Sequence, residues 1–140
     1  MKGVTLMEKL LYLSPEWGEE VEKRFREGLT PEKMNNLTSS MTNIYTHCPG
    51  NGADKYFYVA FAGGAVESVQ VGEGPAPKAE FTITGEYETF AKISRAELGA
   101  QKALMGGKLK LRGNMVKALK LASLVDRLNK IIATIPTRFE

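Results

Sequence analysis

Apolar residues recur at helical spacing near the start of the chain. Four of them occupy every fourth position of one segment: Trp17, Val21, Phe25 and Leu29. This spacing predicts a helix with a narrow apolar stripe, beginning at Ser14-Pro15, where serine suits the N-cap and proline the first helical position. Thr5 and Glu8 have the spacing of a capping box, which predicts a shorter helix before it, over residues 5–13.

The middle of the chain alternates apolar and polar residues, as strands with one buried face do. The alternation predicts four strands, over residues 37–48, 55–62, 65–71 and 79–84. Gly63-Gly64 separates the second from the third. Both positions of a type I′ turn need a positive φ, so this pair predicts a tight hairpin.

The period changes again after residue 85. Helical spacing predicts helices over 85–93 and 98–105, the second capped by Ser94 and Glu97. Residues 108–112 alternate strictly and predict a fifth strand with one leucine face and one basic face. A final helix is expected over 115–132, with Gly113-Asn114 as the turn and cap before it. The order of elements predicts an α+β fold with a mostly antiparallel sheet, and 140 residues suit a single domain over 1–140.

The predicted final helix has an unusually wide apolar surface. Its polar stripe holds Lys117, Lys120, Ser123, Arg127 and Lys130, and almost all its other residues are apolar. A surface helix normally buries a stripe little more than 100° wide, so this helix needs cover from two sides. The sheet provides one cover. The other cover is a further helix of the same chain, a second subunit or a bound apolar ligand. The methionines at 34, 41, 105 and 115 favour a ligand slightly, because flexible methionine side chains adapt to ligands of different shape.

Charge is unevenly distributed. The chain carries a net charge of +3, but residues 102–130 hold eight basic side chains against Asp126 alone, whereas residues 15–32 carry a net charge of −3. Such a field can steer an anionic partner, including a phospholipid headgroup or a phosphate-bearing ligand. Ordinary solvated faces give the same pattern, so the charge alone does not identify a partner.

Residues suited to catalysis or metal binding are sparse. His47 is the single histidine and Cys48 the single cysteine, and adjacent strand residues point to opposite faces. We therefore expect no thiolate–imidazole pair, no metal site and no cofactor, with Cys48 an inert, half-buried thiol. Phosphate-binding glycine motifs are missing, and the aromatic residues lie apart from the basic ones, so no nucleic-acid partner is expected. Neither a signal peptide nor a membrane span is predicted, and the expected location is cytoplasmic.

The C-terminal half resembles the sterol carrier protein type 2 family. The resemblance is carried by residues 79–84, by the helix ending at Leu104-Met105-Gly106-Gly107, and most of all by residues 107–115, and it extends over 37–132. It implies a five-stranded sheet covered by helices, an apolar tunnel between them, and binding of sterols, fatty acids, fatty acyl-CoA or phospholipids. Residues 1–30 resemble an N-terminal helical extension of small stand-alone members. The tunnel positions that agree with the inward pattern here are Phe81, Ile83, Phe90, Leu104, Met105, Leu109, Leu111, Met115 and Leu119.

The function we expect is non-enzymatic binding and transfer of an apolar lipid, such as a fatty acid, an acyl-CoA, or a sterol-like or isoprenoid molecule. Basic residues at 108, 110, 112, 117 and 120 would approach an anionic headgroup or, transiently, a membrane surface. Two alternatives use the same apolar surfaces. One is a homodimeric interaction module with a filled interior, and the other is an accessory subunit that presents a hydrophobic substrate to an enzyme.

Overall fold

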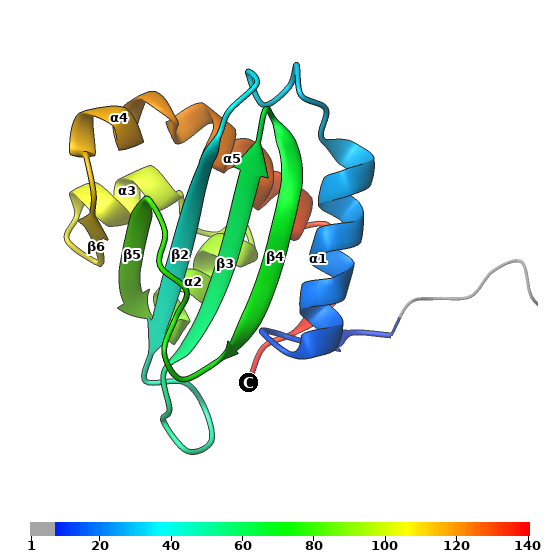
Figure 1. Ribbon diagram of the computed structural model, residues 1–140. Coiled ribbons are helices and arrows are strands. Elements are labelled where there is room, and N and C mark those ends of the chain that lie inside the picture. Colours follow the sequence, from blue (N-terminus) through cyan, green and yellow to red (C-terminus); the bar gives the residue numbers. More distant parts are fainter. Residues whose placement is uncertain (1–7) are drawn as a thin grey trace, which may run out of the picture.

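Five strands form the central sheet of the protein (Figure 1). The computed structural model describes residues 8–140. The strands are β2 (Ser39–Thr46), β3 (Lys55–Ala62), β4 (Ala65–Glu73), β5 (Phe81–Glu86) and β6 (Leu109–Arg112). They lie in the order β4-β3-β2-β5-β6, and every neighbouring pair is antiparallel except β2 and β5. The predicted α+β class and mostly antiparallel five-stranded sheet are confirmed.

The alternation of residues along the strands decides which side chains enter the core. Met41 pairs with Val59 on β3 and with Phe81 on β5, so apolar side chains from three strands meet on one face. Val59 and Phe81 are buried. The loop 74–80 crosses the opposite face (Figure 1), where the Thr42 hydroxyl donates to the Pro77 carbonyl oxygen at 2.9 Å.

The hairpin between β3 and β4 follows the sequence prediction. Gly63 and Gly64 have φ angles of 58° and 84°, in the left-handed region that a type I′ turn requires. A side chain on Gly64 would also lie 2.6 Å from the Cα of Pro31. Two features therefore require glycine at position 64. Its φ angle is positive, and the segment after the first helix approaches it too closely to leave room for a side chain.

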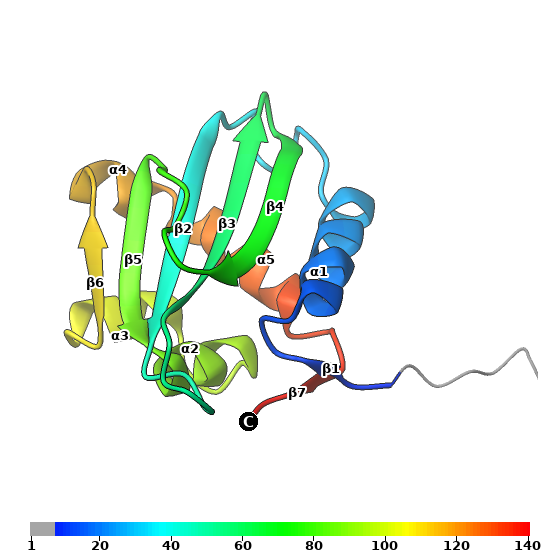
Figure 2. The ribbon, with the colours of Figure 1, turned by 60° about the horizontal axis from the view of Figure 1, so that its bottom comes forward.

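Helices cover one face of the sheet, as Figures 1 and 2 show together. They are α1 (Pro15–Gly28), α2 (Tyr87–Ser94), α3 (Ala100–Met105), α4 (Met115–Lys120) and α5 (Ala122–Ile132). Helix α1 runs beside β4, and its predicted stripe is buried, with Trp17 1% exposed. The Ser14 hydroxyl accepts from the Trp17 amide at 3.2 Å, which confirms the predicted N-cap.

The helix predicted over residues 5–13 is wrong where the structure describes it. Thr5 lies outside the described residues, and Leu10–Leu11 form a short strand, β1, instead of a helix. Strand β1 pairs in parallel with β7 (Thr137–Arg138), and the Leu10 amide donates to the Pro136 carbonyl oxygen at 3.0 Å. A partner near the other end of the chain is invisible to local periodicity, so tertiary pairing overrides the helical pattern.

The helix predicted over 98–105 begins later than its capping box suggested. Its N-cap is Gly99, and Ser94 is buried as the last residue of α2. The Ser94 hydroxyl lies 2.8 Å from that of Tyr12, so it stabilises a buried contact instead of capping α3.

The predicted final helix is broken at Leu121. This residue has φ −93° and ψ 2°, well away from helical ψ, and it ends α4 and precedes α5. Asn114 caps α4 as predicted, because its side chain accepts from the Lys117 amide at 3.0 Å. The break lets α5 pack on the sheet while α4 takes a separate direction (Figure 1).

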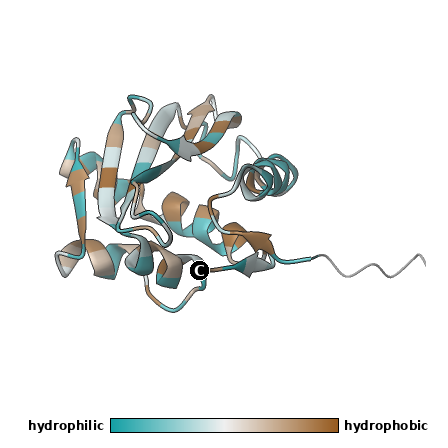
Figure 3. Ribbon diagram, turned by 90° about the horizontal axis from the view of Figure 1, so that it is seen from below, coloured by the Kyte–Doolittle hydropathy of each residue, from teal (hydrophilic) through white to brown (hydrophobic). Residues whose placement is uncertain are grey.

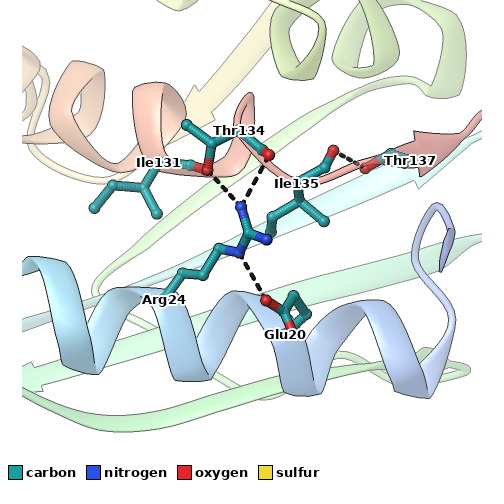
Figure 4. Close-up of polar contacts among 6 residues, drawn as sticks. All are labelled: Glu20, Arg24, Ile131, Thr134, Ile135 and Thr137. Carbon is teal, nitrogen blue, oxygen red and sulfur yellow. Dashed lines mark hydrogen bonds and ion pairs between the residues drawn. The ribbon is translucent and has the colours of Figure 1, made fainter. Parts of the chain in front are cut away.

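Arg24 joins α1 to the end of α5 (Figure 4). Its Nη1 donates to both the carbonyl and the hydroxyl oxygen of Thr134, each at 2.9 Å, and its Nε donates to Glu20 at 2.7 Å. Gly28 lies where a side chain would meet Ile131 at 3.4 Å, so the two helices approach closely. These contacts fix α5 against α1 over the helical face of the sheet.

Along the helices and strands, hydrophobic residues recur with the helical and strand periods seen in the sequence. In Figure 3, hydrophobic and hydrophilic residues alternate along the strands and helices. Across residues 8–140, no helix combines the length and the apolar character that a membrane span needs.

Candidate functional site

An apolar cavity of about 110 Å³ lies between the sheet and helices α3, α4 and α5. We call it the outer cavity. Its sheet side is lined by Met41, Val59, Phe61, Phe81, Ile83, Leu109 and Leu111. Its helix side is lined by Ala100, Leu104, Ala118, Leu119, Leu121, Ala122, Leu124, Val125 and Leu128. Native cores seldom leave voids much larger than a water molecule, so an apolar space of this size needs an explanation.

The strands and helices that wall the outer cavity follow directly from the patterns in the sequence. Leu109 and Leu111 are the inward residues of β6, because Lys110 between them points to the other face of the sheet. Leu124 and Leu128 lie one turn apart on α5 and face the same strands. Gly85 gives β6 room to approach, since a side chain there would lie 2.5 Å from Leu109 Cδ2.

Six of the nine residues expected to contact a ligand line the outer cavity: Phe81, Ile83, Leu104, Leu109, Leu111 and Leu119. Phe90 instead lines a second cavity deeper in the core. That these residues contact a ligand stays a prediction, but the structure brings them to the same region.

Met105 and Met115 do not face the interior as the sequence suggested. Met105 is 76% exposed and Met115 is 46% exposed. Met105 is the last residue of a six-residue helix, and the turn of the helix carries it away from its inward neighbour Leu104. Met115 opens α4, which has no buried residue.

Several lining residues were not identified as site residues from the sequence. Met34 and Met41 were noted for their adaptable side chains, and both line the outer cavity. Val59 and Phe61 sit on the inward face of β3, which the alternation of that strand gives correctly. Met34 lies in a loop without periodicity, so no local pattern predicts that its side chain enters the core.

A smaller cavity of about 40 Å³ adjoins the outer one, and we call it the inner cavity. Six residues line both cavities: Met41, Ile83, Ala100, Leu109, Val125 and Leu128. The remaining wall of the inner cavity includes Tyr12, Trp17, Asn43, Tyr45, Phe90 and Ser94. Two adjoining cavities therefore occupy the place where the resemblance implied a tunnel.

The inner cavity has a more polar wall, although it is well buried. Tyr45 is 2% exposed, and burial raises the pKa of its hydroxyl well above the usual range. Burial likewise raises the pKa of Tyr12, so both hydroxyls stay protonated near neutral pH. The Asn43 side-chain amide donates to the Tyr45 hydroxyl at 3.4 Å.

Helix α4 is held across one side of the outer cavity by few contacts. The Lys117 ammonium donates to the Glu80 carboxylate, which also accepts from the Ser39 hydroxyl. These two donors lower the pKa of the Glu80 carboxyl. Because the ion pair is solvent-exposed, it stabilises the position of α4 by about 1 kcal/mol or less.

Exposed apolar side chains continue outward from the outer cavity along α4. Met115, Val116 and Leu119 lie on one side of this helix, and Val116 is 64% exposed. Leu119 is 46% exposed and also lines the cavity, so the buried and exposed apolar surfaces are continuous. Exposed apolar patches of this kind mark interaction sites more often than isolated apolar residues do.

The five basic residues singled out in the sequence lie on two consecutive elements. Lys108 directly precedes β6, Lys110 and Arg112 belong to it, and Lys117 and Lys120 belong to α4. All five are exposed. Glu80 partly neutralises the charge of Lys117, so the local field is less positive than the sequence count over residues 102–130 suggests. The Asp126 carboxylate, already included in that count, lies at the rim of the outer cavity.

His47 and Cys48 lie just after β2 and do not form a pair. Cys48 is 3% exposed, more deeply buried than expected, and burial raises the pKa of its thiol. The His47 imidazole is exposed and lies 4.0 Å from the Glu86 carboxylate. Within residues 8–140, no group of three or more histidine, cysteine or acidic side chains is arranged to hold a metal ion.

Comparison with protein families gives a match over most of the chain. The family model described as the SCP-2 sterol transfer family matches residues 23–126, which include all five strands of the central sheet and most of the outer cavity.

Curated proteins match over shorter segments. An oleate-induced peroxisomal protein of Candida maltosa is 35% identical over 57 residues, covering 41% of this chain and 45% of that protein. The peroxisomal multifunctional enzyme A of Dictyostelium discoideum is 45% identical over 59 residues, covering 42% of this chain and 13% of that enzyme. The chain therefore matches less than half the length of these relatives.

Solved structures share the fold at low sequence identity. A crystal structure of sterol carrier protein 2 superposes with a TM-score of 0.77 and 20% identity, covering 89% of this chain and 98% of that one. A Thermus thermophilus protein described as possibly a sterol carrier protein gives a TM-score of 0.74 and 19% identity, with 97% of each chain covered. A solution structure of palmitated SCP2L2 from Aedes aegypti gives a TM-score of 0.58 and 21% identity, covering 80% of this chain and 94% of that one.

Proposed function

The chain belongs to the SCP-2 sterol transfer family and is a lipid-binding or lipid-transfer domain, and from that premise we propose that it binds an apolar lipid in the outer cavity without acting on it chemically. The observation that carries the proposal is the apolar space of about 110 Å³ between the sheet and the helices. The palmitated Aedes aegypti protein, which shares the fold, makes a long acyl chain a reasonable first probe.

The energetics of burying a chain favour such binding. Each buried methylene contributes about 0.8 kcal/mol, so sixteen carbons contribute on the order of 12 kcal/mol before the cost of association. Association costs roughly 4–15 kcal/mol, which leaves affinities in the micromolar range within reach. Binding of this kind needs no polar anchor, because shape and apolar area supply the free energy.

Entry of a long chain requires the outer cavity to widen, and we propose that α4 moves to allow it. A cavity of roughly 150 Å³ holds benzene, so about 110 Å³ is too small for sixteen carbons. Helix α4 has no buried residue, and an exposed ion pair links it to Glu80.

We expect Lys117→Gln to accelerate dissociation of a bound fatty acid severalfold in a stopped-flow transfer assay. Lys120→Gln, on the same helix, serves as control; equal dissociation rates in both variants would contradict this role of α4.

The central test is a binding titration of the protein after lipid removal. We expect saturable binding of a fluorescent fatty acid with one site per chain, and competition by unlabelled palmitic acid. Absence of saturable binding would remove the proposal. Native mass spectrometry of protein purified from its own host would identify a co-purified lipid and would detect a homodimer in the same spectrum.

We further propose that the exposed apolar side of α4 and the basic residues beside it contact an anionic membrane during transfer. Each exposed lysine or arginine near such a surface contributes about 1 kcal/mol. Replacing Lys108 and Lys110 by glutamate should therefore slow transfer to anionic vesicles but not to neutral ones. A variant with Lys23→Glu and Lys33→Glu makes the same change in net charge on exposed residues outside β6 and α4. Equal slowing in both variants would contradict a specific docking surface.

A further inference from the structure

The inner cavity contains polar atoms that the protein itself leaves without partners. Within residues 8–140, the buried side-chain atoms that lack a hydrogen-bond partner are Trp17 Nε1 and Asn43 Oδ1. Both residues line the inner cavity, and Trp17 is 1% exposed. Native proteins rarely leave such groups unpaired, because each costs about 1–3 kcal/mol when buried without a partner.

The unpaired atoms belong to one compact cluster. Asn43 lies directly opposite Phe57 in the β2–β3 ladder, and the Trp17 ring lies 5.7 Å from the Phe57 ring, so both flank the same side chain. Trp17 is also 4.9 Å from the Tyr12 ring, which is 6.0 Å from that of Tyr45. The Asn43 amide nitrogen donates to the Tyr45 hydroxyl, which leaves the amide oxygen as the unpaired atom of this side chain.

The two unpaired groups are chemically complementary. Indole Nε1–H can only donate a hydrogen bond, and the amide oxygen of Asn43 can only accept one. A neutral hydroxyl is the simplest group that accepts from a donor and donates to an acceptor at once. A carbonyl oxygen satisfies the indole alone, and an ether or methyl end leaves the amide oxygen unpaired.

A charged group does not fit this cavity. None of the residues that line it among the described part of the chain carries a charge. A buried carboxylate or ammonium without a counter-ion is far more costly than a neutral polar group, so an ionised headgroup is excluded from this end. The headgroup of an anionic ligand then stays at the opposite end, toward the exposed rim of the outer cavity.

The inner cavity is placed to receive the far end of a ligand that enters through the outer one. The two cavities share six lining residues, including Met41, Ile83 and Leu109, and differ in polarity. We propose that the inner cavity is a subsite for a neutral hydroxyl at the buried end of an otherwise apolar ligand, held by Trp17 Nε1 and Asn43 Oδ1. This inference rests on the proposed lipid binding in the outer cavity and specifies the class of lipid: a chain or ring system that carries a hydroxyl remote from its headgroup.

A pair of ligands that differ in one hydroxyl tests this subsite. Palmitic acid and 16-hydroxyhexadecanoic acid have the same chain and carboxylate, and compete for a fluorescent fatty acid in the same assay. A purely apolar inner end would make the hydroxylated acid bind at least tenfold more weakly, because its hydroxyl would be buried unpaired. The proposed subsite predicts the opposite difference in affinity, and we expect the hydroxylated acid to bind about tenfold more tightly than palmitic acid.

Two variants test whether Asn43 and Trp17 cause the preference for the hydroxylated acid. Asn43→Leu removes the acceptor with little change in size, and Trp17→Phe removes the donor. Each should reduce the preference for the hydroxylated acid by roughly tenfold. Gln70→Leu makes the same kind of change, from an amide to an apolar side chain, at an exposed position of β4 that lines neither cavity, and should leave the preference intact. Since the ligand comparison in the unmodified protein needs no variant, the test does not depend on how well each variant folds.

Trp17 supplies a second readout, because it is the single tryptophan of the chain. A hydroxyl at Nε1 should shift its fluorescence emission to longer wavelength with the hydroxylated acid and not with palmitic acid. If palmitic acid binds as tightly as the hydroxylated acid or more tightly, and the emission is the same with both, the inference is wrong, while the lipid-binding proposal stands. If neither acid binds, the lipid-binding proposal fails and the inference fails with it.

Discussion

Filling the outer cavity should stabilise the protein and weaken lipid binding in the same variant. Ala122 lies at the start of α5 and lines the cavity, and leucine has nearly the helix propensity of alanine. The substitution Ala122→Leu therefore adds three carbon atoms to the cavity wall without weakening the helix. Ser123→Leu is the matched control, because Ser123 is the next residue on the same helix and is exposed.

The expected magnitude follows from the volume of the cavity. An empty cavity costs about 24 cal/mol per Å³, so 110 Å³ costs about 2.6 kcal/mol of unfolding free energy. A leucine side chain fills part of that space, and some of the gain is offset by strain. We expect Ala122→Leu to raise the unfolding free energy by about 1–2 kcal/mol. Ser123→Leu should change it by only a few tenths of a kcal/mol, through helix propensity.

Two assays on lipid-free protein measure this prediction. Urea denaturation gives the unfolding free energy, and titration with a fluorescent fatty acid gives the affinity. We expect the affinity of Ala122→Leu to fall at least tenfold, because the added side chain occupies space that the acyl chain needs. A variant that is stabilised and still binds fatty acid like the unmodified protein would refute the assignment of this cavity as the lipid site.

Three further predictions test the structure around the site. Phe25→Ala should lower the unfolding free energy by about 3–5 kcal/mol in urea denaturation, since Phe25 is fully buried, and a loss below 1 kcal/mol would contradict its place in the core. Stability should fall as the pH rises above about 10. Tyr12 and Tyr45 together should contribute a slope approaching 2.7 kcal/mol per pH unit, because their raised pKa values keep them protonated in the folded state while unfolded tyrosines ionise. Replacing both by phenylalanine should reduce the slope by about this amount, and an unchanged slope would show that other groups cause it. Thr134→Val removes the hydroxyl acceptor of Arg24 and should cost about 1 kcal/mol by thermal denaturation, whereas no change would show that this contact does not fix α5.

The local elements of the fold were predictable because each depends on neighbouring residues. Ser14 and Asn114 were identified as N-caps from residue type and spacing, and their side chains accept from the amides of Trp17 and Lys117. The alternation of Leu109 and Leu111 with basic residues gave the inward face of β6 correctly. Such features are set by backbone geometry over a few residues, which a sequence displays directly.

Contacts between distant segments were not predictable in this way. Leu10–Leu11 carry a helical pattern, but pairing with Thr137–Arg138 makes them a strand. Leu121 sits in an unbroken apolar pattern, but the different surroundings of α4 and α5 divide the helix there. In each case the free energy comes from a partner that local periodicity does not contain.

The sequence by itself determined the α+β class, nearly every strand, the family resemblance and the apolar faces from which a binding site could be built. The tertiary structure alone decided that those faces enclose a cavity, that Met105 and Met115 lie outside it, and that Trp17 and Asn43 bring two unpaired polar atoms to its inner end. The physical reason is that periodicity fixes the direction of a side chain relative to its own helix or strand. Whether opposing side chains meet or leave space depends on the distances between elements, which only the packed chain defines.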